Sequence, residues 1–150
     1  MSSLSAIPIR IEHQDAAART GTIGGGVTAL LIEIATHLDR LADGGEPTAI
    51  DLRSLPMSPT DLEQLREALG RGEVVITLQI DGESTIWETA VQGVWWTEHR
   101  DRDGELLAAF IEVARVPGIL LVDSDTLRSG AQRLRASVTD VQSRHELRKN

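Results

Sequence analysis

The sequence predicts an α+β protein with helices packed on one face of a largely antiparallel sheet. Apolar residues recur at helical spacing over residues 27–41 and again over residues 127–141. Between them, residues 74–116 change to the two-residue alternation of strands, interrupted by turn-forming pairs. The predicted order is helices, then a block of strands, then a final helix. This order is typical of the α+β class.

The chain of 150 residues has the length and composition of a single soluble domain, with 41% apolar and 25% charged residues. Its formal net charge of −8 disfavours nucleic acid as a partner, because phosphates attract basic surfaces. The absence of cysteine excludes disulfides, thiolate nucleophiles and cysteine-ligated metal sites. A reducing compartment fits this composition, so we expect a cytoplasmic protein. No segment approaches the roughly 20 apolar residues of a membrane span.

The chain divides into a leader, one domain and a short tail. Residues 1–26 lack sustained periodicity and are expected to form a flexible leader, with a candidate extended piece at residues 7–11. Residues 27–147 are expected to form the single α+β domain, and residues 148–150 a frayed tail. The glycines before the first helix lack the Lys and Ser/Thr of a phosphate-binding loop, so they favour a hinge.

Three helices are predicted, packed mainly on one face of the sheet. The first begins at Val27 and ends at Gly44-Gly45. The second has Ser58 as its N-cap and Pro59 in its first turn. The third follows residues 123–125, where capping of the helix is favoured over a calcium loop. Its apolar stripe is Leu127, Ala131, Leu134, Val138 and Val141.

Four strands joined by short turns predict an antiparallel meander. The predicted strands are residues 74–80, 85–91, 94–100 and 106–116. Asp81-Gly82 and Asp103-Gly104 are turn signals between strands. Residues 48–52 are a candidate short fifth strand, which the second helix would join to the first meander strand as a parallel crossover.

No sequence motif indicates a catalytic site, a metal site or a cofactor-binding site. The four histidines are scattered through different segments, without the close pairing of a zinc site, and no G-x-S-x-G elbow is present. Glu88, Glu98 and Glu112 lie on different strands, and two of them could converge as an acid–base pair. Cross-strand pairing with Arg100 or Arg115 is the favoured interpretation of these carboxylates. We therefore expect no catalytic residue, no metal site and no cofactor.

Three tryptophans lie close together in a chain whose remaining aromatic residue is Phe110. Trp95 and Trp96 are adjacent on a strand, so they point to opposite faces. If helices cover only one face, one of the two indoles is exposed, and exposed tryptophan is a preferred anchor for a protein partner. An edge-capping or dimer-packed tryptophan is the alternative. The predicted partner-binding residues are Glu88, Trp95, Trp96, His99, Glu112 and Arg115.

Five short segments carry a resemblance to a known family when they are taken in order. They are residues 29–34, 45–52 with Leu55-Pro56, 69–74, 88–89 with 93–95, and 110–113 with 116–120. Together, over residues 29–120, they resemble the hydrogenase expression/formation proteins of the HupH/HyaF type, in particular the C-terminal region of that family. This chain looks like one copy of a module found in longer two-part members.

The resemblance implies an accessory role in maturing nickel–iron hydrogenases, through binding of the iron–sulfur small subunit, its precursor or another maturation protein. It brings no catalytic residues with it, and we expect a non-enzymatic, chaperone-like protein. Two alternatives stay open. One is a small-molecule-binding or enzymatic domain that uses Glu88, His99, Glu112 and Arg115 in a pocket at the sheet. The other is a structural homo-oligomer, such as a homodimer with sheets packed through the tryptophans.

Overall fold

The computed structural model describes residues 23–79 and 81–147. Residues 1–22 of the expected leader, with the candidate extended piece at residues 7–11, and the expected tail at residues 148–150 lie outside the described residues.

Helix α1 (Gly25–Ala42) begins two residues earlier than predicted. No side chain caps its first turn. Instead, the backbone N–H of Gly24 donates to Gln64 Oε1 of the second helix at 3.1 Å. This long-range bond fixes the start of α1, which is why the local sequence pattern placed that start too late.

Helix α2 (Pro59–Leu69) has the predicted start. The Asp61 backbone N–H donates to Ser58 Oγ at 3.2 Å, and the Ser58 backbone N–H donates to Asp61 Oδ2 at 2.8 Å. These reciprocal bonds form a capping box, which satisfies two backbone donors that the first turn leaves free. The helix ends before Gly70, which has a φ of +63°.

The sheet contains five antiparallel strands in the order β1-β5-β4-β3-β2. Their bounds are β1 Thr48–Asp51, β2 Val75–Gln79, β3 Glu83–Glu88, β4 Val94–Arg100 and β5 Leu106–Val113. The α+β class, the four-strand meander and the fifth strand are therefore confirmed.

The predicted parallel crossover is wrong. β1 pairs with β5 in antiparallel orientation, and β1 and β2 occupy opposite edges of the sheet. The pairing places Ile50 opposite Ile111, and both side chains are buried in the core. The antiparallel pairing at this edge buries Ile50 beside Ile111, and the helical connection in the sequence does not indicate which edge the short strand joins.

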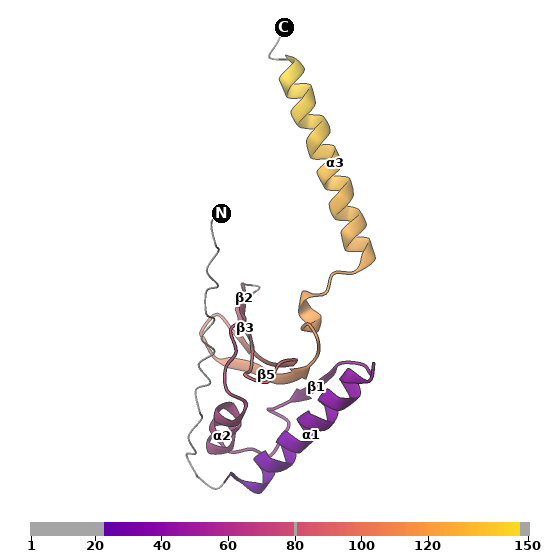
Figure 1. The fold of residues 1–150 in the computed structure, drawn as a ribbon. Coiled ribbons are helices and arrows are strands. Elements are labelled where there is room, and N and C mark those ends of the chain that lie inside the picture. The colour runs from indigo at the N-terminus through magenta and orange to yellow at the C-terminus, as the bar shows by residue number, and fades with distance from the viewer. Residues whose placement is uncertain (1–22, 80, 148–150) are drawn as a thin grey trace, which may run out of the picture.

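Helices α1 and α2 cover one face of the sheet (Figure 1). α1 supplies Val27, Leu30 and Ile34 to the core, and α2 supplies Leu65 and Leu69. On this face the sheet contributes the following buried side chains: Ile50, Trp87, Val94, Trp96, Ala109, Ile111 and Val113. One apolar core therefore lies between the helix pair and the sheet.

Helix α3 (Ser124–Leu147) follows the short helix η1 (Gly118–Leu120) and extends away from the sheet (Figure 1). The expectation that about three helices pack on one face holds for α1 and α2 but not for α3. Its stripe residues Leu127, Leu134 and Val138 stay at least half exposed. Periodicity identifies the apolar face of a helix but not the surface that covers it. Among the described helices, none combines the length and apolar character that a bilayer crossing requires.

Candidate functional site

The strand register sorts the predicted site residues onto two faces of the sheet. Glu88, Trp95 and Glu112 are directly opposite one another on β3, β4 and β5 and form one row on the face away from α1 and α2. Trp96 points the other way and pairs with Trp87 beneath the helices. The two adjacent tryptophans therefore point to opposite faces, as predicted.

Neither tryptophan is exposed, so the expectation of an exposed indole is wrong. Trp95 is 7% exposed and Trp96 is 1% exposed. Trp95 packs with Ile86 and Ala114 in a second, smaller apolar cluster, and its Nε1 donates to the Ala114 carbonyl at 3.0 Å. The second face of the sheet thus has its own small core, which the assumption of one covered face did not include.

Polar residues surround this second cluster. Glu112 Oε1 accepts a hydrogen bond from the Gly118 backbone N–H at 2.7 Å, which ties η1 to the sheet. The Nδ1 atom of His99 lies 2.6 Å from Ser84 Oγ, and the His99 ring meets Phe110 edge-on at 6.1 Å. Glu88 and Glu112 are separated by Trp95 in their row, so the structure does not bring them together as an acid–base pair.

Arg115 lies just beyond β5, and its guanidinium donates to the carbonyl of Leu41 near the end of α1 at 3.3 Å. Arg115 and Glu88 line the same pocket of about 380 Å³, together with Leu38 and Gln92. The structure therefore gathers Glu88 and Arg115 at one end of the sheet. Trp96 takes no part in this pocket.

A cluster on the helix side was not predicted as a site. We call it the tryptophan–arginine cluster, and it consists of Arg66, Arg71, Trp87, Trp96, Glu98 and Arg100. The Trp87 and Trp96 rings stack with centroids 5.7 Å apart and an interplanar angle of 14°. The Arg66 guanidinium lies 4.8 Å from the Trp96 centroid, and that of Arg71 lies 5.0 Å from the Trp87 centroid.

Glu98 is the charged centre of this cluster and is only 7% exposed. Its carboxylate accepts bonds from Trp96 Nε1 at 3.1 Å, from Arg100 at 2.9 Å and from Arg66. Burial raises the pKa of Glu98, but the Arg100 hydrogen bond and the Arg66 charge outweigh it, so the pKa lies below its usual value. Glu98 is therefore ionised at neutral pH and holds both arginines in place.

The cluster lines a pocket of about 550 Å³ between α2 and the sheet. Alternation along β4 carries a signal for it, because Glu98 lies two residues after Trp96 and so shares its face. Arg66 follows the buried Leu65 on α2, but the sequence does not show where α2 crosses the sheet. Glu98 does pair with Arg100, but the two residues lie on the same strand, so the predicted cross-strand pairing is wrong for this pair.

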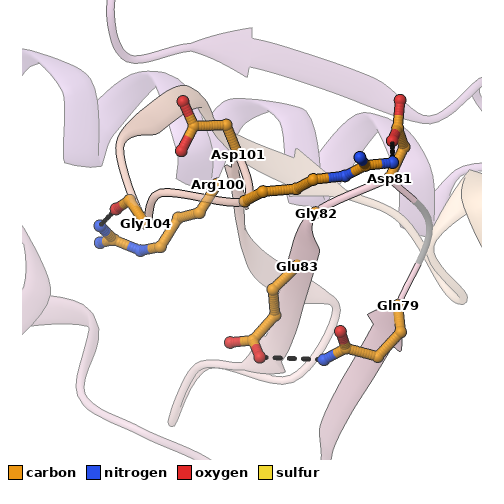
Figure 2. A pocket seen from close by; sticks show the side chains of 8 residues that line it. Gln79, Asp81, Gly82, Glu83, Arg100, Asp101 and Gly104 are labelled. Atoms are coloured by element: carbon orange, nitrogen blue, oxygen red, sulfur yellow. Dashed lines mark hydrogen bonds and ion pairs between the residues drawn. The ribbon is translucent and has the colours of Figure 1, made fainter.

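A further pocket of about 550 Å³ lies where the β2–β3 and β4–β5 turns meet (Figure 2). The side chains of Gln79 and Glu83 bond to each other at 3.0 Å, and Arg102 pairs with Asp81. Arg100 donates to the Gly104 carbonyl at 3.1 Å. These polar groups satisfy one another's hydrogen-bonding capacity, and the Arg102–Asp81 pair links the two turns. Among the described residues, no group of three or more His, Asp or Glu side chains is placed to hold a metal ion.

Residues 26–141 match the HupH hydrogenase expression protein, C-terminal conserved region. The chain belongs to this family. The resemblance inferred from residues 29–120 is therefore confirmed, and the HupH match extends further, into α3.

Named relatives agree with the HupH assignment. The chain is 29% identical over 131 residues to the hydrogenase expression/formation protein HupH of Rhizobium leguminosarum bv. viciae, covering 87% of this chain and 45% of the relative. It is 30% identical over 108 residues to the hydrogenase expression/formation protein HoxQ of Azotobacter vinelandii, covering 71% of this chain and 38% of that protein. The chain thus spans less than half the length of these curated relatives.

A solved structure, the hydrogenase expression protein HupH from Thiobacillus denitrificans ATCC 25259, is similar to this chain with a TM-score of 0.73 and 44% identity. The similarity covers 78% of this chain and 98% of that one. Both groups of polar residues described above, around Trp95 and around Glu98, lie within the residues that match the HupH family.

Proposed function

We propose that this chain is a non-enzymatic, chaperone-like protein in the maturation of nickel–iron hydrogenases, and that it binds the iron–sulfur small subunit or its precursor in the cytoplasm. The observation that carries the proposal is the HupH family match over residues 26–141. The relatives' names, hydrogenase expression/formation protein, supply the process. Binding of the small subunit is the step that goes beyond those names.

The proposed contact surface is the second face of the sheet and its end, which we call the client surface. It consists of Glu88, His99, Glu112 and Arg115, and the buried Trp95 lies between Glu88 and Glu112 in their row. Glu88 is half-buried beside a pocket, so a partner side chain that enters there meets a partly desolvated carboxylate. A chain of net charge −8 complements a basic client segment, and complementary charge speeds encounter and selects the partner.

Trp96 does not belong to the client surface, because it lies beneath α2 within the tryptophan–arginine cluster. Trp95 acts as a support for the row of Glu88 and Glu112 and not as an inserted anchor. Alanine variants of either tryptophan would damage the fold and cannot test binding. Charge reversal at the edge of the surface is the cleaner probe.

The test measures binding of the purified chain to the small-subunit precursor by titration calorimetry. Glu88→Lys should weaken the complex by roughly tenfold or more, because a like charge then faces the basic segment. Asp39→Lys makes the same charge change on the exposed side of α1 and should bind almost as the parent does. Thermal unfolding of both variants confirms that each is folded.

The two levels of the proposal fail separately. If the parent chain forms no complex with the precursor, the proposed binding function is wrong. If a complex forms and Glu88→Lys binds as tightly as Asp39→Lys, the function stands and the client surface has been placed on the wrong face.

A further inference from the structure

The apolar stripe of α3 is exposed from Leu127 to Val141, except for Ala131, which is half-buried. Leu127 is 61% exposed, Leu134 69%, Val138 51% and Val141 67%. The segment leading into the helix adds Ile119, Leu121 and Val122, which are also exposed. These side chains lie within or beside the HupH family match, which ends at residue 141. A stripe of this extent is larger than scattered surface apolar residues explain.

The spacing of the stripe is that of a coiled coil. Apolar residues at 127, 131, 134, 138 and 141 alternate steps of four and three, which is a heptad repeat with Leu127, Leu134 and Val141 at d and Ala131 and Val138 at a. A β-branched residue at a combined with leucine at d favours two parallel strands, and Val138 at a beside Leu134 at d follows that pattern, whereas Ala131 at a and Val141 at d do not. A helix that packs on a globular core shows a wider apolar face than this narrow seam.

We propose that α3 pairs with α3 of a second copy of this chain, as a parallel and in-register two-stranded coiled coil. The occupant of the stripe is thus the same stripe of the partner copy. This proposal is independent of the client surface, which lies on the sheet and uses none of these residues.

Charge complementarity selects the second copy and the parallel orientation. In a parallel pair, a g residue faces the e residue five positions later on the partner. Arg128, at e, already pairs with Asp125 within its own helix, and Asp123, at g, accepts the capping bonds of Thr126. In the parallel pair the guanidinium of Arg128 also faces Asp123 of the second copy, and symmetry makes this additional contact twice. Arg135, at e, faces Gly130. In an antiparallel pair e residues face e residues, and both Arg128 and Arg135 are at e, so like charges would face each other and repel.

Sedimentation of the full chain over a range of concentrations tests the association. The parent should change from monomer to dimer as concentration rises. Leu134→Asp places a charge at the centre of the seam and should raise the dimer dissociation constant by roughly tenfold or more. Ala136→Asp makes the same charge change on the opposite side of α3 and should leave the constant nearly unchanged.

Introduced cysteines test the register without depending on the stability of a charged variant. The native sequence has no cysteine, so a single introduced residue reports only on itself. In the parallel dimer Val141→Cys lies opposite its own copy and should form a disulfide-linked dimer under mild oxidation. In an antiparallel arrangement a residue at d packs against a residue at a of the partner, so position 141 lies away from its own copy and this variant does not cross-link. Ala136→Cys is the matched control.

A parent chain that stays monomeric at every concentration, with Val141→Cys cross-linking no faster than Ala136→Cys, overturns the proposal and leaves the stripe to a different protein. A dimer that persists in Leu134→Asp also overturns it, because the copies then meet elsewhere. Cross-linking of Val141→Cys together with dissociation of Leu134→Asp supports the proposed pair.

Discussion

Trp96 donates its indole N–H to the carboxylate of Glu98 at 3.1 Å, and both side chains are buried on the same face of β4. The same carboxylate binds Arg100 and Arg66, and Arg66 lies over the Trp96 ring. A charge, its counter-charges and an aromatic surface are thus fixed as one unit between α2 and the sheet. Removing the Glu98 carboxylate leaves the buried Trp96 N–H without its partner, and removing either arginine takes one counter-charge from the buried carboxylate.

Glu98→Gln should destabilise the protein by about 2 kcal/mol, because it removes the buried negative charge that forms ion pairs with Arg66 and Arg100. Urea unfolding measures this change. The matched control is Glu63→Gln, which removes a weaker partner of Arg66, 3.6 Å away and exposed. An exposed pair contributes less than about 1 kcal/mol. Equal losses in the two variants would contradict the role given to Glu98.

Acid should destabilise the folded chain in a specific window. The pKa of Glu98 is lowered in the folded state, although burial raises it, because Arg100 and Arg66 stabilise the charged form more strongly. Hydrogen bonds from Ser58 lower the pKa of Asp61 in the same way. The unfolded chain therefore binds protons at higher pH than the folded chain, so stability present at neutral pH is lost as pH falls below about 5.

The measurement is urea unfolding at a series of pH values from neutral to acid. Glu98→Gln should show a shallower loss of stability with falling pH than the parent, since it cannot take up that proton. A parent whose unfolding free energy is independent of pH across this window would refute the assignment.

Gly82→Ala should be among the most destabilising small substitutions in the sheet. Gly82 has a φ of +137°, and a Cβ there would lie 2.2 Å from the Arg100 carbonyl oxygen. We expect a loss of at least about 2 kcal/mol from clash and strain together. Gly104 also has positive φ, +85°, but nothing lies within 4 Å of its Cβ position.

Gly104→Ala is therefore the control for backbone strain alone, with an expected cost of about 1 kcal/mol. Thermal unfolding of both variants gives the comparison. If Gly104→Ala proves as harmful as Gly82→Ala, the close approach of the β2–β3 turn to Arg100 is not what limits position 82.

Trp95→Phe should cost about 2 kcal/mol, since it removes the indole bond to the Ala114 carbonyl and some packing against Ile86. Trp95→Ala removes the ring as well and should cost about 4 kcal/mol. Denaturant unfolding of the two variants separates the hydrogen bond from the packing. Unchanged stability in both would mean that the second cluster does not support the sheet.

Local signals predicted most of the secondary structure. Ser58, Pro59 and Asp61 placed the start of α2, and the capping box confirms it. Asp81-Gly82 predicted a turn between two strands, and both residues have positive φ in the connection between the paired Gln79 and Glu83, which is one residue longer than a two-residue hairpin turn. These features depend on residues close together in the chain, which is why the sequence alone predicts them.

Contacts between segments far apart in the sequence were harder to predict. The position of β1 depends on Ile50 meeting Ile111, and the start of α1 depends on Gly24 meeting Gln64. For the candidate site, alternation placed Trp95 and Trp96 on opposite faces, but it did not reveal the second cluster that buries Trp95. It also gave no indication that α2 carries Arg66 over Trp96. Each of these depends on how two distant segments pack.

The pairing of β1 with β5 has a consequence for synthesis of the chain. Thr48 can pair with Val113 only after all four strands of the meander have been synthesised and have left the ribosome. Until then Ile50 lacks its neighbour, and contacts between residues so far apart in sequence slow folding. A nascent chain stalled before β5 would expose an unfinished sheet edge to the chaperones and proteases of its own cell.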